Sequence, residues 1–377
     1  MKVAHISAVF QNNGGGTGKA CYNLVKKLAD SKDMNLTIFL PSSQKQTMTV
    51  EKELKIEYVR SVYSWGNAAL VPDLVDKLKG FDLIHLHYPF YGGAEFAVRA
   101  ARKYHIPYVI TYHTETVFNS FIMNMILEIY NRTYLKYIIA DADLIIGVTK
   151  THLYHSNIIC FIADRHRIKM ISNAVDDNFI NAPIRRLRTS TKNKRIGFCS
   201  NLDKAHYYKG LGRVIDAISV LNNDHELFIA GAGDLIDSYK NKAKQLGVDG
   251  QCHFLGNLEG NSLVKFYDNI DLLVSPSEIP ESFLISNLEA LSRGKKIITT
   301  DWPATRELKK YFPDNLYHLL KKNDDLSKII NKCLASSPSS HETADAIKTI
   351  KNNFNWQSVA DSTIEQYNKI LQNHHDR

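Results

Sequence analysis

The sequence predicts an α/β protein with two doubly wound, mainly parallel sheets, and three observations carry this prediction. Short segments rich in Ile, Leu and Val alternate with helical patterns, as they do when helices connect parallel strands. The alternation starts again near residue 194. The 377 residues are enough for two domains of ordinary size. A polar, basic segment without acidic residues, 181–194, separates the two halves, so we expect domains at 1–185 and 186–355.

The expected elements follow in order along each half. A strand at 2–10 leads through a glycine-rich loop into a helix at 19–29, and the second half has a helix at 210–221. Further strands are predicted at 36–40, 56–59, 83–87, 108–112 and 144–148, and then at 195–200, 226–230, 252–255, 272–275 and 296–300. The chain ends in an amphipathic helix. Its predicted buried stripe is Trp356, Val359, Ile364, Tyr367 and Leu371.

Composition narrows the class of protein. With 44% hydrophobic and 23% charged residues, the chain has the make-up of a globular protein. Its net charge of +8 is spread over both halves, so we expect no nucleic-acid partner, while attraction to an anionic membrane stays open. The five cysteines are scattered, which argues against a disulfide framework or a zinc site and suits a reducing cytosol. Since no apolar run reaches the length of a membrane span, we predict a cytoplasmic protein, with peripheral contact to the inner face of the membrane left open.

The strongest functional pattern is a pair of carboxylates, Glu281 and Glu289, on either side of a predicted helix start. The strand at 272–275 precedes the pair and the strand at 296–300 follows it. Open α/β sheets bind ligands at such strand–loop–helix units. Eight residues of helix rise about 12 Å, close to the separation of sugar and ribose in a nucleotide sugar. The helix N-terminus between the carboxylates would favour a diphosphate. Solvated helix charges are the alternative.

This segment resembles the Glu-x7-Glu motif of retaining GT-B glycosyltransferases of family 4 (glycosyl transferases group 1), and the resemblance extends over most of the chain. It implies a GT-B fold, in which two Rossmann-like domains face a central cleft. The N-domain would bind the acceptor, and the last helix, 356–377, would pack back onto it. The resemblance also implies transfer of a sugar, with retention and without a metal or other cofactor. The donor would be a GDP- or UDP-sugar, and the acceptor a hydroxyl of a polysaccharide or lipid-linked oligosaccharide.

The glycine-rich loop 14–18 is not a P-loop. Asn13 stands where that motif needs Gly, and Ala20 stands where it needs Ser or Thr. The loop is similar to the Gly-Gly loop of family 4, which would turn the amides of Gly15 and Gly16 towards a phosphate or acceptor. A plain tight turn is the alternative.

The other predicted site residues come from the same resemblance. Thr111-Tyr-His113 closes a strand as the family's aromatic-His-Thr element does, whose histidine approaches the donor sugar. Lys209 corresponds to the family lysine that neutralises the leaving diphosphate, but Asn201 stands at the position of its partner arginine. The resemblance implies catalytic roles for Glu281, His113 and Lys209, and donor binding by Gly15, Gly16, Asn201, Lys209, Ser282, Phe283, Leu284, Ile285 and Glu289.

Two departures leave alternatives open. Lys204, His206 or Arg213 could replace the missing arginine. Leu284 stands where the family has a glycine, and it would narrow or reshape the donor pocket. These departures keep a catalytically weak partner subunit as an alternative, beside a GT-B sugar-nucleotide epimerase or phosphorylase.

Three further patterns receive structural interpretations. His85 and His87 share one face of a strand, but no third metal ligand lies nearby in sequence, so we favour structural or acceptor-facing roles. The pair Asp141 and Asp143 marks a helix-to-strand junction, and we predict no metal site. The segment 118–140 is apolar except for one charged stripe, which predicts core burial. A surface for lipid or a lipid-linked acceptor is the alternative.

Overall fold

The computed structural model describes residues 1–11, 15–43, 48–51, 54–117, 120–184 and 193–375. The chain forms two compact units: Met1–Asn173 together with Trp356–Arg377 (unit 1), and Ala174–Asn355 (unit 2). Among the described residues, no helix combines the length and apolar character needed to cross a bilayer.

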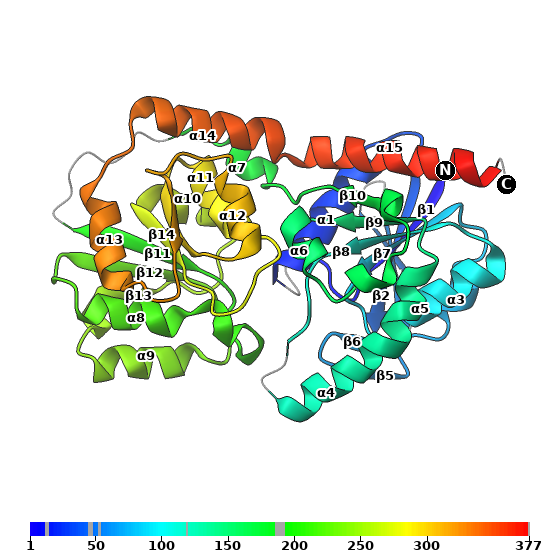
Figure 1. Cartoon of the computed structure of the whole chain (residues 1–377), viewed down its shortest axis with the longest axis horizontal. Helices are drawn as coiled ribbons and strands as arrows, with labels where there is room; N and C mark the ends of the chain where they lie inside the picture. The colour runs from blue at the N-terminus through cyan, green and yellow to red at the C-terminus, as the bar shows by residue number, and fades with distance from the viewer. Residues whose placement is uncertain (12–14, 44–47, 52–53, 118–119, 185–192, 376–377) are drawn as a thin grey trace. The chain divides into compact units, whose positions relative to one another are not determined.

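Unit 1 is organised around a mainly parallel sheet (Figure 1). Its strands are β1 (Lys2–Ile6), β2 (Asn35–Ser42), β3 (Met48–Glu51), β4 (Leu54–Arg60), β7 (Leu83–Tyr88), β8 (Tyr108–Tyr112), β9 (Leu144–Gly147) and β10 (Ile168–Met170). They lie in the order β10-β9-β8-β7-β1-β2-β4-β3, in which only the β3–β4 pair is antiparallel among the described strands. The order runs outward in both directions from β1, which makes the sheet doubly wound, as predicted.

Helices cover both faces of this sheet. One face and its helices enclose a core that includes Leu86, Tyr108, Ile110 and Ile138. On the other face, α1 packs against the last helix, α15. The remaining elements are α1 (Gly15–Ala29), β5 (Tyr63–Trp65), β6 (Ala68–Leu70), α2 (Leu74–Lys77), α3 (Ala94–Tyr104), α4 (Phe121–Tyr130), η1 (Asn131–Leu135), α5 (Lys136–Ala140), α6 (Lys150–Tyr154), η2 (Ile159–Phe161), η3 (Arg165–Arg167) and α15 (Trp356–His375).

The buried stripe of α15 differs in part from the prediction. Trp356, Val359 and Tyr367 are buried as predicted, but Ile364 and Leu371 are only half-buried. Because an α-helix has 3.6 residues per turn, positions 360, 363, 366 and 367 lie on the same side of α15 as Val359. Ile364 and Leu371 therefore fall beside the stripe. Ala360, Thr363 and Gln366 are buried in their place.

Unit 2 repeats the architecture with a sheet whose described strand pairs are all parallel (Figure 1). Its strands are β11 (Lys194–Cys199), β12 (His225–Ala230), β13 (Cys252–Phe254), β14 (Leu272–Ser275), β15 (Lys296–Thr300) and β16 (Tyr317–Leu320), in the order β13-β12-β11-β14-β15-β16. Its helices are α7 (Asp177–Asn181), η4 (Lys204–Lys209), α8 (Leu211–Ser219), α9 (Ile236–Gln245), η5 (Asp249–Gln251), α10 (Gly260–Asn269), α11 (Ile285–Ser292), α12 (Pro303–Lys309), α13 (Leu326–Ala335) and α14 (Ser340–Asn353). The strand order reverses between β11 and β14, and ligands bind at such switch points.

The chain passes from unit 1 to unit 2 at 173–174 rather than at the expected 185–186. The reason is α7, which packs against α10 and α11. Its Phe179 ring meets the Tyr267 ring at 5.6 Å between centroids. The buried Arg293 guanidinium donates to the carbonyls of Phe179 (3.2 Å), Ala182 (3.0 Å) and Pro183 (2.7 Å). The first residues of the expected linker are thus part of unit 2, while 185–192 lie outside the described residues.

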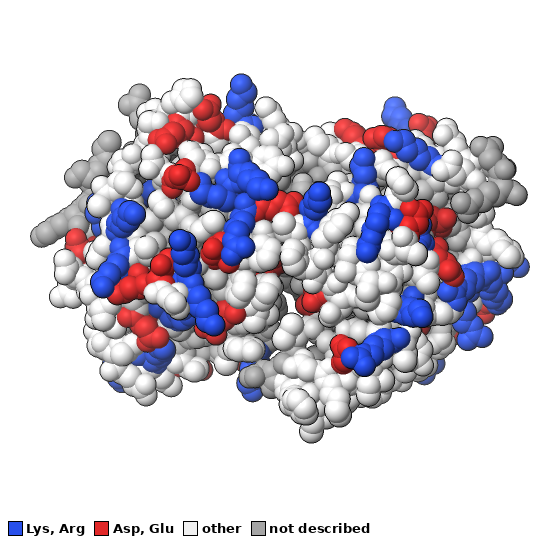
Figure 2. Space-filling model, viewed as in Figure 1, with Lys and Arg blue, Asp and Glu red and all other residues white. Residues whose placement is uncertain are grey.

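The prediction of core burial for 118–140 is wrong for its first half. No residue of α4 is buried, and Phe121 and Ile122 are 85% and 62% exposed. Only the following turns enter the core, through Leu135, Ile138 and Ile139. The charged stripe shows which side of the helix faces solvent, but it does not show whether the apolar side has anything to pack against. Figure 2 shows a largely uncharged surface over α4.

Candidate active site

An ion pair at the carboxyl ends of two neighbouring strands is the centre of the candidate site. Lys209 ends η4, which follows β11, and Glu281 lies in the loop that follows β14. β11 and β14 are paired in the sheet. The Lys209 Nζ lies 2.7 Å from the Glu281 Oε1, and these side chains are only 20% and 10% exposed. The structure therefore brings two predicted catalytic residues together at the switch point of unit 2.

A glycine holds the two loops in contact. Gly210 has a φ of +82°, and a Cβ at this position would lie 2.5 Å from the carbonyl oxygen of Pro276. The backbone N–H of Glu278 donates to the carbonyl of Tyr208 at 2.7 Å. A residue with a side chain would push the loops apart. Sequence analysis missed this role, although the Lys-Gly pair at a predicted helix start was its signal.

The ammonium group of the pair stays charged. Burial lowers the pKa of Lys209, but the Glu281 carboxylate and Tyr208 raise it by more, so it lies above its ordinary value. The site therefore holds a fixed positive charge that its carboxylate partner orients.

The loop after Glu281 leads directly into α11. Leu284 is the N-cap residue, in extended conformation, and the helix begins at Ile285. Ser282, Phe283 and Leu284 are buried, and Ile285 is half-buried. Because Glu281 precedes the helix, the two carboxylates are not on one helix, and the predicted helical rise does not give their separation.

Glu289 is not a solvated helix charge. It is 5% exposed, and its Oε2 accepts a hydrogen bond of 2.7 Å from the hydroxyl of Tyr267. Burial, together with the nearby Cys199 and Glu289, raises the pKa of Tyr267 well above its ordinary value, so this hydroxyl remains a donor. The Tyr267 bond holds one oxygen of the Glu289 carboxylate in place.

The structure shows the surroundings of the three side chains that could replace the missing arginine. Asn201, at the arginine position, is partly exposed after β11. His206 bonds Asp203 at 2.7 Å, and Arg213 donates to the Pro276 carbonyl at 3.2 Å. Lys204 is exposed, and among the described residues its ammonium has no partner. Lys204 is thus available to an anion, and Arg213 keeps its charge and further N–H donors beside its one bond to a carbonyl.

In unit 1, Gly15 and Gly16 form the first turn of α1. Gly15 has a φ of +60°. Gly16 is exposed, and no atom lies within 4 Å of the position that a Cβ would take. Packing against the described residues therefore does not require glycine at 16. The loop residues 12–14 lie outside the described residues.

His113 follows β8 and is the end of a buried series of hydrogen bonds. Its Nε2 lies 2.9 Å from the Nδ1 of His87, and the His87 Nε2 lies 2.9 Å from the Nδ1 of His5. Burial lowers the pKa of His113 to about 4. The Nδ1 of His113 is buried and has no partner among the described residues.

Three more groups, Tyr367, His85 and Thr111, extend this series. The His85 Nδ1 bonds the hydroxyl of Tyr367, and its Nε2 lies 2.7 Å from the Thr111 Oγ1. The Tyr367 hydroxyl lies 3.3 Å from the Nε2 of His5. We call the six groups, Thr111, His85, Tyr367, His5, His87 and His113, the histidine chain.

Sequence analysis missed His5 as a neighbour of His85 and His87. The β1–β7 pairing places His5 opposite His85. One ring nitrogen from each of these three histidines lies within 4.8 Å of the others, a spacing that could hold a metal ion. His85 and His87 have no third ligand nearby in sequence, and the fold brings His5 beside them from another strand.

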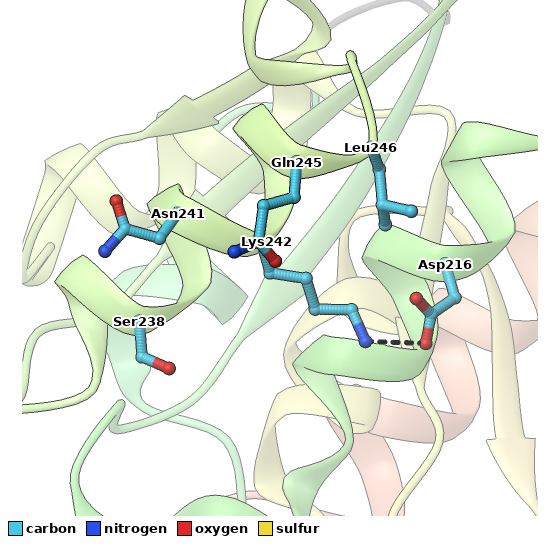
Figure 3. A pocket seen from close by; sticks show the side chains of 6 residues that line it. All are labelled: Asp216, Ser238, Asn241, Lys242, Gln245 and Leu246. Atoms are coloured by element: carbon cyan, nitrogen blue, oxygen red, sulfur yellow. Dashed lines mark hydrogen bonds and ion pairs between the residues drawn. The ribbon is translucent and has the colours of Figure 1, made fainter.

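A surface hollow in unit 2 contains none of the predicted site residues. It lies between α8 and α9, with a volume of about 680 Å³, and is lined by polar residues such as Ser238 and Asn241 (Figure 3). A half-exposed ion pair of 2.8 Å, between Lys242 and Asp216, crosses it. Its lining contains none of the predicted catalytic groups, so we treat it as a groove between helices rather than a reaction site.

Two family models match the chain, one for each half. Residues 14–179 match the model described as Glycosyltransferase Family 4, and residues 183–350 match that of Glycosyl transferases group 1. An uncharacterized glycosyltransferase of Methanocaldococcus jannaschii is 28% identical over 43% of this chain and 42% of its own length. The lipopolysaccharide 1,2-N-acetylglucosaminetransferase of Salmonella typhimurium is 28% identical over 33% of this chain and 32% of its own. The chain thus matches less than half the length of these two relatives.

Longer matches come from a third relative and from solved structures. An uncharacterized 41.2 kDa protein of the cps region of Klebsiella pneumoniae is 24% identical over 88% of both chains. HepE of Anabaena, solved in complex with UDP, superposes with a TM-score of 0.72 at 18% identity, over 98% of this chain and all of its own. Sucrose-phosphate synthase of Thermosynechococcus elongatus gives a TM-score of 0.75 at 15% identity, over 99% of both chains.

Proposed function

Since the chain belongs to the group 1 glycosyltransferases of family 4 and has the GT-B fold, we propose that it transfers a sugar from a nucleotide sugar to an acceptor hydroxyl. The observation that carries the proposal is the Lys209–Glu281 pair beside the start of α11. A charged ammonium and a helix N-terminus both stabilise a departing diphosphate. The Glu281 carboxylate orients the ammonium and leaves its second oxygen for sugar hydroxyls.

The proposed chemistry needs positioning and positive charge but no protein nucleophile. The acceptor hydroxyl would attack the anomeric carbon on the face from which the diphosphate leaves; as the bond to the diphosphate breaks, the hydroxyl proton passes to the departing diphosphate, and the anomeric configuration is retained. Lys209, with Lys204 or Arg213 in place of the missing arginine, would neutralise the leaving group, so we propose catalysis without a metal. Glu289 would bind the ribose hydroxyls, with its other oxygen held by Tyr267. His113, Gly15 and Gly16 are the predicted contributions of unit 1.

We propose UDP-sugars ahead of GDP-sugars as donors, because HepE is described in complex with UDP and with UDP-glucose. The acceptor we propose is a hydroxyl of a surface glycan or its lipid-linked precursor. The relatives support this class, since one acts in lipopolysaccharide synthesis and another comes from a cps region.

The apolar face of α4 supports a peripheral membrane contact for a cytoplasmic enzyme. Phe121, Ile122, Met125, Ile126 and Ile129 are all at least half exposed. The β5–β6 hairpin adds an exposed Tyr63 and Trp65, and it is joined to α4 through Tyr91, which accepts from the Ala69 N–H at 3.0 Å and whose ring lies 5.0 Å from that of Tyr130. Interfacial helices combine such an apolar face with aromatic residues nearby.

Vesicle co-sedimentation tests the membrane contact separately from catalysis. We expect the wild-type protein to sediment with phosphatidylglycerol vesicles and the Phe121→Ser, Ile122→Ser double variant to remain in solution. Val220→Ser is the matched control, because Val220 is 71% exposed on unit 2. Equal sedimentation of the double variant and wild type would refute the contact.

The first test of the function itself is a thermal-shift panel with UDP, GDP, ADP and their sugar conjugates in the presence of a chelator. A ligand that binds only the native state adds about 2.7 kcal/mol of stability at a hundredfold excess over its dissociation constant. We expect one nucleotide to raise the melting temperature and Glu289→Ala to abolish the rise. Asp237→Ala, on the exposed side of α9, is the control.

The panel also separates the competing functions. An epimerase would convert the nucleotide sugar without an acceptor, and a phosphorylase would require inorganic phosphate. A partner subunit without its own activity would bind none of the nucleotides. Binding followed by acceptor-dependent release of the nucleoside diphosphate is the result that the transferase proposal requires.

A further inference from the structure

The histidine chain is a continuous path with one open end. Five hydrogen bonds connect its six groups in the order Thr111, His85, Tyr367, His5, His87 and His113. All six side chains are at most 5% exposed. Every ring nitrogen of the four histidines takes part except the Nδ1 of His113. The hydrogen-bond partner of this nitrogen must therefore come from outside the histidine chain.

The histidines of the chain are neutral, so their bonds are directional. Burial, reinforced by repulsion between the rings, lowers the pKa of His5, His85 and His87 well below the ordinary value, and burial lowers that of His113 to about 4. A neutral imidazole has one donor and one acceptor nitrogen. Each bond between two histidines consequently determines the direction of the next, and the hydroxyl of Tyr367 passes this direction from His85 to His5 when it donates to either of them.

Two arrangements use the Tyr367 hydroxyl as both donor and acceptor; a third, in which its oxygen accepts from both His85 and His5, leaves the buried Tyr367 proton and the His113 Nδ1 without partners among the described residues. In the first, all four histidines carry their proton on Nδ1: His85 donates to Tyr367, Tyr367 donates to His5, and the series continues to His113, which presents an Nδ1–H. In the second, all four carry it on Nε2, the bonds run the opposite way, and His113 presents a bare Nδ1. The ends of the chain decide between them.

The Thr111 end favours the first arrangement. There the Thr111 hydroxyl donates to the Nε2 of His85, so its proton has a partner. In the second arrangement His85 donates to Thr111, and the buried Thr111 proton has no acceptor among the described residues. The second arrangement thus leaves both ends of the chain unpaired, and buried polar groups without partners are costly.

We propose that the histidine chain holds His113 as a neutral Nδ1–H donor for one ligand oxygen, with Tyr367 and His5 as positioning residues. Resting on the proposed transfer function, this oxygen belongs to a hydroxyl of the donor sugar. A small cavity lies beside His113. Its volume is about 20 Å³, and its lining is mainly apolar, with Thr111, Ser172 and Asn173 among its polar residues. Such a space accommodates one water or one hydroxyl and excludes a phosphate group.

The tautomers of the histidine chain can be measured without a ligand and without an activity assay. Long-range ¹H–¹⁵N correlation spectra of the full chain with ¹⁵N-labelled histidine distinguish the two neutral tautomers. We expect four neutral histidines in the Nδ1–H form at pH 7.5. Tyr367→Phe removes the hydroxyl that relays direction, so His5, His87 and His113 should become mixtures of tautomers. Tyr108→Phe is the matched control, because Tyr108 is buried, loses a hydrogen bond to the Ile138 carbonyl and lies on the opposite face of the sheet.

Each outcome decides the proposal. Nε2–H forms at His87 and His113 in the wild-type protein, or unchanged tautomers in Tyr367→Phe, would overturn it. So would one tightly bound transition metal per chain that His5→Gln removes, since the three nitrogens would then be ligands.

An activity measurement links the chain to the donor. Tyr367→Phe should raise the KM for the nucleotide sugar roughly two- to tenfold, the value of one neutral hydrogen bond, with less effect on kcat. If the tautomers are as proposed but the protein uses no nucleotide sugar, the proposed function is refuted and the role of the histidine chain is not. If transfer occurs but Tyr367→Phe changes neither KM nor the tautomers, the role of the histidine chain is refuted and the proposed function is not.

Discussion

The Lys209–Glu281 pair allows its structural and catalytic roles to be separated in one double-mutant cycle. The perturbations are Lys209→Met, Glu281→Gln and their combination. Surface ion pairs contribute about 0–1 kcal/mol, whereas breaking a fully buried pair costs about 3–5 kcal/mol. With side chains that are 20% and 10% exposed, this pair lies between the limits. We expect each single variant to lose about 2 kcal/mol of unfolding free energy.

The double variant distinguishes the two roles. It leaves neither charge buried alone, so it should recover part of the stability lost in the single variants. Transfer should not recover, because the leaving diphosphate still lacks its ammonium. Removing such a preorganised electrostatic contact costs about 10²–10³ in kcat. Urea unfolding and nucleoside diphosphate release, measured on the same four proteins, give both quantities.

The working pH does not disturb this comparison. The pKa of Lys209 is raised in the folded state, so the pair's contribution is complete below the unfolded lysine value of about 10.4 and is lost as the pH rises through the folded pKa. Assays between pH 7 and 8 lie on the plateau. Lys242→Met is the control, because the Lys242–Asp216 pair is as short, at 2.8 Å, but half exposed and remote from the candidate site. A double variant that regains both stability and transfer would refute a catalytic role for Lys209.

Three further predictions follow from burial and backbone geometry. The free energy of unfolding should fall as the pH is lowered, because the pKa values of the four histidines in the histidine chain are depressed in the folded state. This stability is present above about pH 6.5 and is lost below it, by roughly 5 kcal/mol from pH 7.5 to 5.5 for four groups. A flat urea-unfolding profile over this range would contradict neutral histidines. Arg293→Met should lower the free energy of unfolding by about 3–5 kcal/mol, because Asp268 would keep an unpaired buried charge. Arg132→Ala, which removes an exposed ion pair, should lower it by under about 0.5 kcal/mol. Similar urea midpoints for the two variants would refute the anchoring of α7. Gly210→Ala should lower both stability and nucleotide binding. Gly247 also has a positive φ, but an added Cβ would meet no atom within 4 Å, so Gly247→Ala should lower stability alone. Equal nucleotide binding by the two variants would show that the close approach of Gly210 to Pro276 is unimportant.

Local patterns were sufficient to predict where the main strands lie along the sequence and to find the segment from Glu281 to Glu289. Strands such as β8 and β14 are short apolar runs bounded by polar residues, so their positions can be read without knowing their partners. The structure also contains β10 and β16, which sequence analysis did not predict. Each has three or four residues, and each exists because a longer neighbour, β9 or β15, supplies its hydrogen bonds. Such strands are determined by the sheet rather than by their own residues.

The same distinction explains which parts of the site were missed. Glu281, Ser282 and Glu289 are close in sequence, and one motif contains them. His5 and His87 are 82 residues apart, and His85 and Tyr367 are 282 apart, so no local pattern contains either pair. His113 was predicted from a short motif, yet its hydrogen-bonding state depends on a tyrosine in the last helix. A truncation after 355 would therefore remove Tyr367 and change the chemistry of His113 even if the sheet of unit 1 remained folded.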